Sequence, residues 1–233
     1  MRKLLKYLED FLGLIYPELC LACAKNLPPG NEAVCIQCQY YLPKTDYHID
    51  QENAFAEHFW GRVKVEAGAA LYHFVKSGRT QKLIHNLKYK HKTEIGINLG
   101  RLYGKTLRTA SVFKEVDLIL PVPMHPRKEK KRGYNQCDLF ARGLSETMEI
   151  PWTRTILIKS EETTTQTKKT RQERFDNVKS AFDLVNPNAL RGKHVLIVDD
   201  VITTGATLEA CAQKILEVPG VKVSMATIAI ARR

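Results

Sequence analysis

The sequence predicts an α/β protein in which a parallel β-sheet is flanked by helices and preceded by a small four-cysteine module. From about residue 66 onward, short apolar segments alternate with helical patterns, which is typical of a parallel sheet covered by helices. Before that point, four cysteines fall within nineteen residues as two C-x2-C pairs. The 233 residues are enough for one full-sized domain and one accessory module.

The composition excludes several classes of protein. Hydrophobic residues make up 44% and charged residues 26%, values that exclude a wholly disordered chain. No run approaches about 18 uninterrupted apolar residues, so a membrane span is excluded. The first twenty residues mix charges with leucines and lack a small-residue cleavage site, so we expect no secretory signal and a cytoplasmic location. The net charge of +11 favours a polyanionic partner, either nucleic acid or a phosphate-rich ligand.

An amphipathic helix is predicted at the start of the chain, over residues 1–16. Leucines and other apolar residues recur there at helical spacing, with charged residues largely between them. We expect this helix to pack on the rest of the protein. The alternative is a helix on a membrane surface, which Glu9 and Asp10 on the polar face disfavour.

Residues 17–42 are predicted to form a zinc-ribbon-like module. Its two cysteine pairs offer four thiolates to one tetrahedral zinc ion: Cys20, Cys23, Cys35 and Cys38. Four protein ligands leave no open position for water, so the zinc is expected to be structural. The alternative is a set of unrelated buried cysteines. Residues 43–65 are expected to link the module to the main domain, residues 66–233.

The main domain is predicted to alternate strands with helices. Strands are expected at 67–75, 117–122, 156–158, 181–185, 195–199 and 221–230. Helices are expected at 79–89, 93–109, 135–148 and 205–217. Ligands of such sheets bind at the carboxyl ends of the strands, so functional residues are expected there.

The most informative segment is residues 192–208. A buried apolar strand ends there in Asp199 and Asp200, and a loop with threonines and Gly205 then opens a helix. Backbone N–H groups at a helix start bind anions, and threonine hydroxyls can donate to phosphate oxygens. The two carboxylates suit a sugar diol or the water around a magnesium ion. The pattern therefore predicts a ribose 5-phosphate site; the alternative is that Asp200 or Thr203 caps the helix.

This run resembles the phosphoribosyl pyrophosphate (PRPP) motif of type I phosphoribosyltransferases. Over nearly its full length, the chain is similar to one branch of them, the ComF/GntX family of competence-associated proteins. The similarity includes the cysteine pairs, the segments 84–89, 121–125 and 132–136, and a spaced set made of Gln166, Arg174, Asn177, Ala181 and Phe182. The chain departs from the family pattern at Lys90-His91, which displaces a common glycine, and at Lys169, where leucine is common.

The resemblance implies a type I fold with a flexible loop over the site. It also implies that Asp199 and Asp200 hold the ribose hydroxyls, and that the turn after strand 117–122 lies near the pyrophosphate. The residues implied to bind the 5-phosphate are Thr203, Thr204, Gly205, Ala206 and Thr207.

Two basic segments supply cations for a pyrophosphate group, independently of the resemblance. The candidates are Arg132, Lys168, Arg171 and Arg174. The basic run 127–132 is equally compatible with a nucleic-acid patch or a solvated face. The Thr-rich stretch 160–174 is the candidate for a loop that closes over the ligand and excludes water.

The predicted activity is the magnesium-dependent transfer of a phosphoribosyl group from PRPP to an acceptor of unknown identity. Departing pyrophosphate develops negative charge, which magnesium and preorganised cations stabilise. The resemblance also implies a place in DNA uptake, with single-stranded DNA and a competence helicase as partners. The alternatives are a non-catalytic PRPP-binding protein and a zinc-ribbon nucleic-acid-binding protein.

Three further patterns receive structural interpretations. Residues 100–106 look like a nucleotide-binding P-loop but are one residue short and lie inside a helical pattern. Glycines spaced four apart at 96, 100 and 104 share one helix face and are expected to allow close helix packing. Cys137 and Cys211 are expected to be small buried hydrophobic residues.

Overall fold

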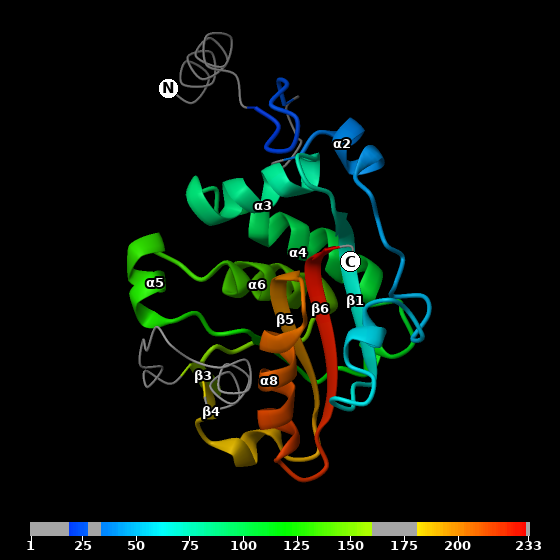
Figure 1. The fold of residues 1–233 in the computed structure, drawn as a ribbon, viewed down its shortest axis with the longest axis vertical. Coiled ribbons are helices and arrows are strands. Elements are labelled where there is room, and N and C mark those ends of the chain that lie inside the picture. Colours follow the sequence, from blue (N-terminus) through cyan, green and yellow to red (C-terminus); the bar gives the residue numbers. More distant parts are fainter. Residues whose placement is uncertain (1–18, 28–33, 160–180, 232–233) are drawn as a thin grey trace, which may run out of the picture.

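The structure is a computed structural model that describes residues 19–27, 34–159 and 181–231. Its main sheet has four parallel strands in the order β1-β6-β5-β2 (Figure 1). Their bounds are Ala67–Phe74 for β1, Lys222–Ala231 for β6, His194–Ile202 for β5 and Leu118–Pro121 for β2. The predicted helix over 1–16 and the predicted loop over 160–174 lie outside the described residues. None of the described helices is long and apolar enough to cross a membrane.

Helices cover both faces of this sheet, as predicted. On one face lie α3 (Arg79–Tyr89), α4 (Glu94–Leu107) and α6 (Gln136–Met148), and on the other lies α8 (Ala206–Leu216) (Figure 1). All four fall within the helical ranges expected from the sequence, because each carries an apolar stripe at helical spacing.

The strand β5 divides its side chains between two hydrophobic cores. Val195 and Ile197 belong to the core under α8, whereas Leu196 and Val198 belong to the core under α3, α4 and α6. Successive side chains of a strand point to opposite faces of the sheet. Past Val198 the carboxylates of Asp199 and Asp200 start in different directions, but one oxygen of each lies within 4.8 Å of the other.

Several elements differ from the sequence prediction. The segments around 157 and 182 do not join the parallel sheet: β3 (Leu157–Lys159) and β4 (Phe182–Leu184) form a separate antiparallel pair. Strand β5 continues past the acidic pair to Ile202, because β6 extends far enough to pair with it. Further short elements that were not predicted are α2 (Ile36–Tyr41), α5 (Pro126–Arg132) and the 3-10 turns η1 (Ala56–His58), η2 (Phe113–Glu115) and η3 (Pro187–Leu190).

The basic run at 127–132 forms helix α5 because both of its ends are capped. His125 is the N-cap, and its ring nitrogen accepts a hydrogen bond from the Arg127 N–H at 3.2 Å. Pro126 occupies the first helical position, and Gly133 ends the helix in the left-handed conformation at φ 85°. These are ordinary signals for the start and the end of a helix. They were not used in the prediction because the segment was interpreted from its concentration of charge.

The glycines of α4 allow this helix to pack closely on α6, as expected. A Cβ atom on Gly100 would meet the Phe140 carbonyl oxygen and would lie 2.8 Å from the Gly143 Cα. Gly143 on α6 is equally crowded by the Ile97 carbonyl oxygen of α4. The run at 100–106 is therefore a helix-packing surface.

Residues 43–65 and the four-cysteine module pack against the main domain. The Pro43 carbonyl oxygen accepts a hydrogen bond from the His73 N–H of β1 at 2.7 Å, and Phe55 is fully buried. The Asn86 side chain of α3 donates to the Leu21 carbonyl oxygen at 2.8 Å. Cys20 shares one hydrophobic core with residues of β1 and α3. The module is thus an extension of the core under α3, α4 and α6.

Candidate functional site

A small cleft lies at the carboxyl end of β5, where α8 begins. Asp199 lines it together with Val201 and the loop residues, which are Ile202, Thr203, Thr204, Gly205, Ala206, Thr207 and Leu208. Gly205 is the N-cap of α8 at φ 79° and contributes no side-chain cap. The alternative that Asp200 or Thr203 caps the helix is therefore wrong. The Thr204 hydroxyl accepts from the Ala206 N–H at 3.4 Å, and the helix start also offers its dipole and its other backbone N–H groups to an anion.

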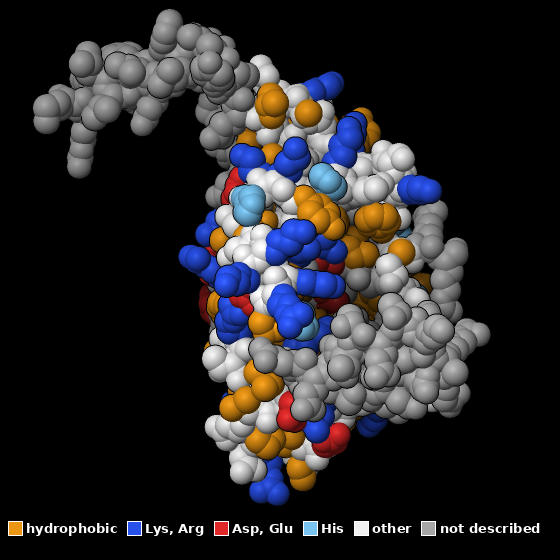
Figure 2. All heavy atoms as spheres, turned by 60° about the vertical axis from the view of Figure 1, so that its left-hand side comes forward, with side chains coloured by type: hydrophobic (Ala, Val, Ile, Leu, Met, Phe, Trp, Pro, Cys, Tyr) orange, Lys and Arg blue, Asp and Glu red, His pale blue; other side chains and the backbone are white. Residues whose placement is uncertain are grey.

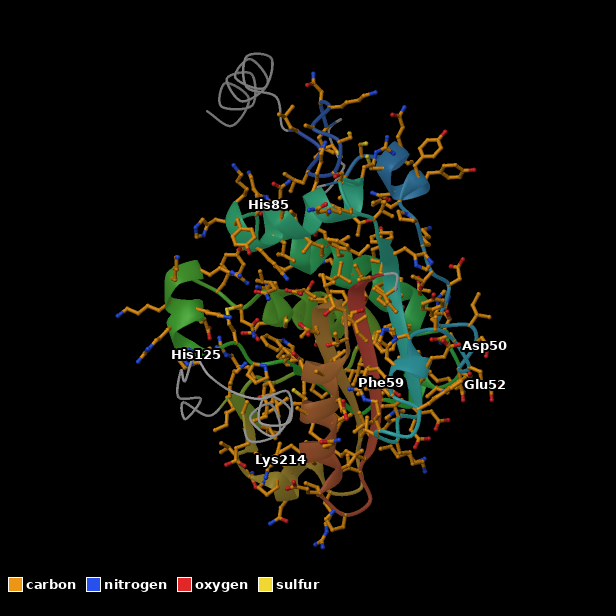
Figure 3. The ribbon with its side chains drawn as sticks, viewed as in Figure 1. Asp50, Glu52, Phe59, His85, His125 and Lys214 are labelled. Carbon is orange, nitrogen blue, oxygen red and sulfur yellow. The ribbon has the colours of Figure 1, made fainter. Side chains whose placement is uncertain are left out.

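The loop before α8 packs against residues in and next to η1, a contact that was not predicted from the sequence. A Cβ on Gly205 would lie 3.2 Å from the Phe59 ring and 3.6 Å from the His58 Cβ, so the position requires glycine (Phe59 is labelled in Figure 3). Arg62 forms an ion pair with Glu209 of α8 and donates to the Thr204 carbonyl oxygen at 3.4 Å. Residues expected to be only a linker thus fix the shape of the loop.

The two adjacent carboxylates have different surroundings. The Asp200 side chain is only 6% exposed, and both of its oxygens are engaged. Its Oδ1 accepts from the Lys88 ammonium of α3 at 2.8 Å, and its Oδ2 accepts from the Gln136 amide of α6 at 2.5 Å. Asp199 instead lines the cleft at the start of α8. Lys88 and Gln136 therefore lie at the site, although they were not among the site residues predicted from the sequence.

The electrostatics of Asp199 follow from its neighbours. Burial and the adjacent Asp200 carboxylate raise the pKa of Asp199 to about 6. The Cys137 thiol donates to Asp199 Oδ1 at 3.2 Å. Cys137 is buried, as predicted, and burial followed by the Asp199 charge raises the pKa of its thiol. Cys137 therefore stays a protonated donor to the carboxylate that lines the cleft.

Arg132, a predicted pyrophosphate candidate, is connected to this site through Gln136. Its guanidinium donates to the Gln136 side-chain oxygen and lies 5.6 Å from the centre of the Tyr89 ring. Figure 2 shows Lys and Arg side chains gathered on this side of the molecule, with hydrophobic side chains among them. His85 of α3 and His125 at the start of α5 are on the same side (Figure 3). The other three candidates lie outside the described residues: Lys168, Arg171 and Arg174.

A divalent cation fits this site only in part. One ligand atom each from Cys137, Asp199 and Asp200 lies within 4.8 Å of the others. A protonated thiol is a poor ligand for magnesium, which prefers oxygen and keeps several of its waters. Both Asp200 oxygens already have partners. Asp199 is thus the protein oxygen donor best placed for magnesium that arrives on a phosphorylated ligand.

The four-cysteine cluster can hold a metal ion. The cluster is Cys20, Cys23, Cys35 and Cys38, and their sulfur atoms all lie within 4.8 Å of one another. The sulfurs of Cys23 and Cys35 are 3.9 Å apart. Sulfurs bound tetrahedrally at about 2.3 Å from zinc lie about 3.8 Å apart, so this spacing fits the ion.

The backbone of the module favours a thiolate at Cys20. Burial raises the pKa of this thiol, but backbone N–H groups of Cys35 and Cys23 outweigh that effect and bring the pKa down to about 7. The Cys35 N–H donates to the Cys20 sulfur at 3.3 Å. N–H groups that donate to a sulfur stabilise its thiolate form and so favour a bound metal.

Comparison with known proteins identifies both the domain and the family. The phosphoribosyl transferase domain family matches residues 135–233. The chain is 31% identical over 214 residues to Competence protein F of Haemophilus influenzae, covering 87% of this chain and 92% of the relative. It is also 31% identical over 219 residues to the DNA utilization protein YhgH of Escherichia coli K12, with the same coverage.

Solved structures of similar shape include one described as the allosteric regulatory enzyme of purine biosynthesis. Its sequence is 22% identical, and the match covers 61% of this chain and 30% of that chain with a TM-score of 0.42.

Proposed function

The chain belongs to the ComF/GntX family of competence-associated proteins, and from this premise we propose that it binds PRPP and transfers its phosphoribosyl group with the help of magnesium. The cleft at the start of α8 carries the proposal. It brings together the start of α8, three threonines and the carboxylate of Asp199 at the end of β5. A 5-phosphate on the loop would place the ribose hydroxyls at the end of β5, beside Asp199.

The chemistry of the transfer matches the groups around this cleft. Loss of pyrophosphate from C1 of the ribose leaves an electron-poor sugar and an anionic leaving group. Magnesium bound to the phosphates neutralises part of that charge when PRPP is present. Asp199 is positioned for the sugar or for the water around that magnesium, whereas Arg132 and Lys88 bring positive charge from α5 and α3.

Release of pyrophosphate tests the transferase proposal. The zinc-loaded protein is incubated with PRPP, magnesium and candidate acceptors, including single-stranded DNA and free bases, and pyrophosphate is measured with time. We expect release that depends on magnesium and falls at least tenfold in Asp199→Asn, because that variant loses the carboxylate of the cleft. Tight PRPP binding without release would instead support the non-catalytic alternative.

Single-stranded DNA is the second ligand that we propose, as a partner or as the acceptor. The relatives include one named as a DNA utilization protein and one named as a competence protein. Tyr89 is 64% exposed, and Arg132 lies over its ring. Exposed aromatic rings among cations stack on unpaired bases. Binding should weaken steeply with salt and in Lys130→Ala/Lys131→Ala, and failure to bind at low salt would remove this proposal.

For the four-cysteine cluster we propose structural zinc. The support is the closed set of four sulfurs, the 3.9 Å separation of two of them and the position of the module in the main core. A metal with four protein ligands leaves no position for a substrate. The zinc is therefore proposed to stabilise the fold.

A further inference from the structure

Four side chains from four elements form one hydrogen-bonded chain at the end of β5. Lys88 of α3 donates to Asp200, Gln136 of α6 donates to the other oxygen of Asp200, and Arg132 of α5 donates to Gln136. The guanidinium of Arg132 also lies over the ring of Tyr89, the residue next to Lys88. This network brings two cations to the end of the strand.

The network lies on the α3 and α6 side of the end of β5, next to the phosphate loop. Asp200 follows Leu196 and Val198 in the alternation of β5, toward α3, α4 and α6. The loop leads into α8, and Asp199 lines the cleft there while its Oδ1 accepts from the Cys137 thiol of α6. The acidic pair is therefore divided: one carboxylate faces the cleft, and the other holds a lysine and an amide.

In PRPP the 5-phosphate and the C1 diphosphate occupy opposite ends of the ribose ring. With the 5-phosphate on the loop before α8 and the ribose at the end of β5, the diphosphate points away from α8. The described side chains on that side include the ammonium of Lys88 and the guanidinium of Arg132. A diphosphate carries several negative charges and requires such cations.

We propose that Lys88 contacts the diphosphate of PRPP, and that Asp200 and Gln136 are positioning residues that hold Lys88 and Arg132 ready for it. This inference rests on the proposed function. The contact between Lys88 and the diphosphate is an addition to that function. The Lys88 side chain is 24% exposed and is paired with Asp200 Oδ1 at 2.8 Å. Binding exchanges part of the Asp200 contact for a phosphate contact.

Two ligands distinguish this role from a merely structural one. PRPP and ribose 5-phosphate share the sugar and the 5-phosphate, and only PRPP carries the diphosphate. Calorimetric titrations with magnesium therefore compare both ligands with the zinc-loaded parent protein, with Lys88→Met and with Lys82→Met. Lys82 is the matched control, because it is exposed on the same helix. Inorganic pyrophosphate is the third probe.

We expect Lys88→Met to weaken PRPP and pyrophosphate binding at least tenfold and to change ribose 5-phosphate binding less than twofold. Lys82→Met should change none of the three more than twofold. An equal loss for PRPP and ribose 5-phosphate would show that Lys88 acts only through the fold, and unchanged PRPP binding would show that it makes no contact; either result overturns the inference. A parent protein that binds neither sugar phosphate overturns the proposed function itself.

Removal of Lys88 leaves the Asp200 carboxylate without its cation, which can destabilise the chain. The double variant Lys88→Met/Asp200→Asn removes both charges and is measured where the single variant does not fold. It should show the same selective loss for ligands that carry a diphosphate. If it binds PRPP as tightly as Asp200→Asn alone, Lys88 is not a diphosphate contact.

Discussion

At the scale of single residues, the division of the acidic pair comes from strand geometry. Asp199 and Asp200 are adjacent in the chain, and a strand directs adjacent side chains to opposite faces. One therefore meets the loop before α8, and the other meets Lys88 and Gln136. In this Asp-Asp pair at a strand end, one residue thus lines the cleft and the next anchors a lysine and an amide.

Protonation of His194 provides a residue-scale prediction. His194 is buried at the start of β5, and its ring is hydrogen-bonded to the Ser224 hydroxyl at 2.8 Å. Burial lowers the pKa of His194 below its ordinary value. The unfolded chain therefore binds this proton more readily than the folded protein, so the contribution of His194 to stability is present above about pH 6.5 and is lost as the pH falls.

The test compares the parent with His194→Gln, which can keep a hydrogen bond to Ser224. The free energy of unfolding in denaturant should fall between pH 7.5 and 5.5 by less in the variant than in the parent. Groups that titrate in both proteins cancel in this difference. Equal slopes would mean that His194 titrates alike in the folded and unfolded chains.

At the scale of elements, the close crossing of α4 and α6 depends on glycine. The substitution Gly100→Ala places a methyl group against the Phe140 carbonyl oxygen and the Gly143 backbone. Since backbone cannot rotate away as a side chain can, the helices must separate, at a cost of roughly 1–3 kcal/mol. Thermal and denaturant unfolding should show this loss. The exposed Lys105→Ala on the same helix serves as the control, and a stable Gly100→Ala would show that the crossing tolerates separation.

The sequence contained enough information to locate the regular elements. Helices over 79–89 and 135–148 and the apolar part of β5 follow from hydrophobic periodicity, which is a local signal. The pairing of β3 with β4 was missed because two short apolar segments do not specify parallel or antiparallel partners. Helix α5 was missed because the segment was interpreted from its charge alone and not from its capping residues.

The candidate site was only partly accessible from the sequence. The loop at 203–207 is contiguous, so its residue types indicate phosphate chemistry together. The contacts of Asp200 with Lys88 and Gln136 join positions 112 and 64 residues apart. Phe59 and Arg62 behind the loop come from a segment that looked like a linker. Such contacts depend on topology, which one sequence does not display.

At the scale of the whole molecule, the four-cysteine module and the main domain share a core. Cys20 and Cys38 are buried in the same hydrophobic cluster as Tyr72 of β1 and Leu83 of α3. Loss of metal from the module is therefore expected to destabilise the rest of the protein as well. A module that was merely attached would unfold alone.

Removal of zinc tests this coupling. We expect one zinc per chain in the parent and loss of that zinc in Cys20→Ser. We also expect the chelated parent and this variant to unfold at a temperature several degrees lower for the whole chain, in one transition. Cys211→Ala, on α8 and outside the cluster, should keep the zinc. Metal content equal to that of the parent in Cys20→Ser would contradict the zinc assignment, and an unchanged main transition would contradict the coupling.

The main proposal is that the cleft at the end of β5 binds PRPP. Calorimetric titration of the zinc-loaded protein with PRPP and magnesium tests it most directly, with the variant Asp199→Ala/Asp200→Ala titrated beside the parent and its fold checked by circular dichroism. We expect saturable binding of one PRPP per chain by the parent and loss of that binding in the folded double variant. A parent that does not bind PRPP, or a double variant that binds it equally well, would contradict the claim.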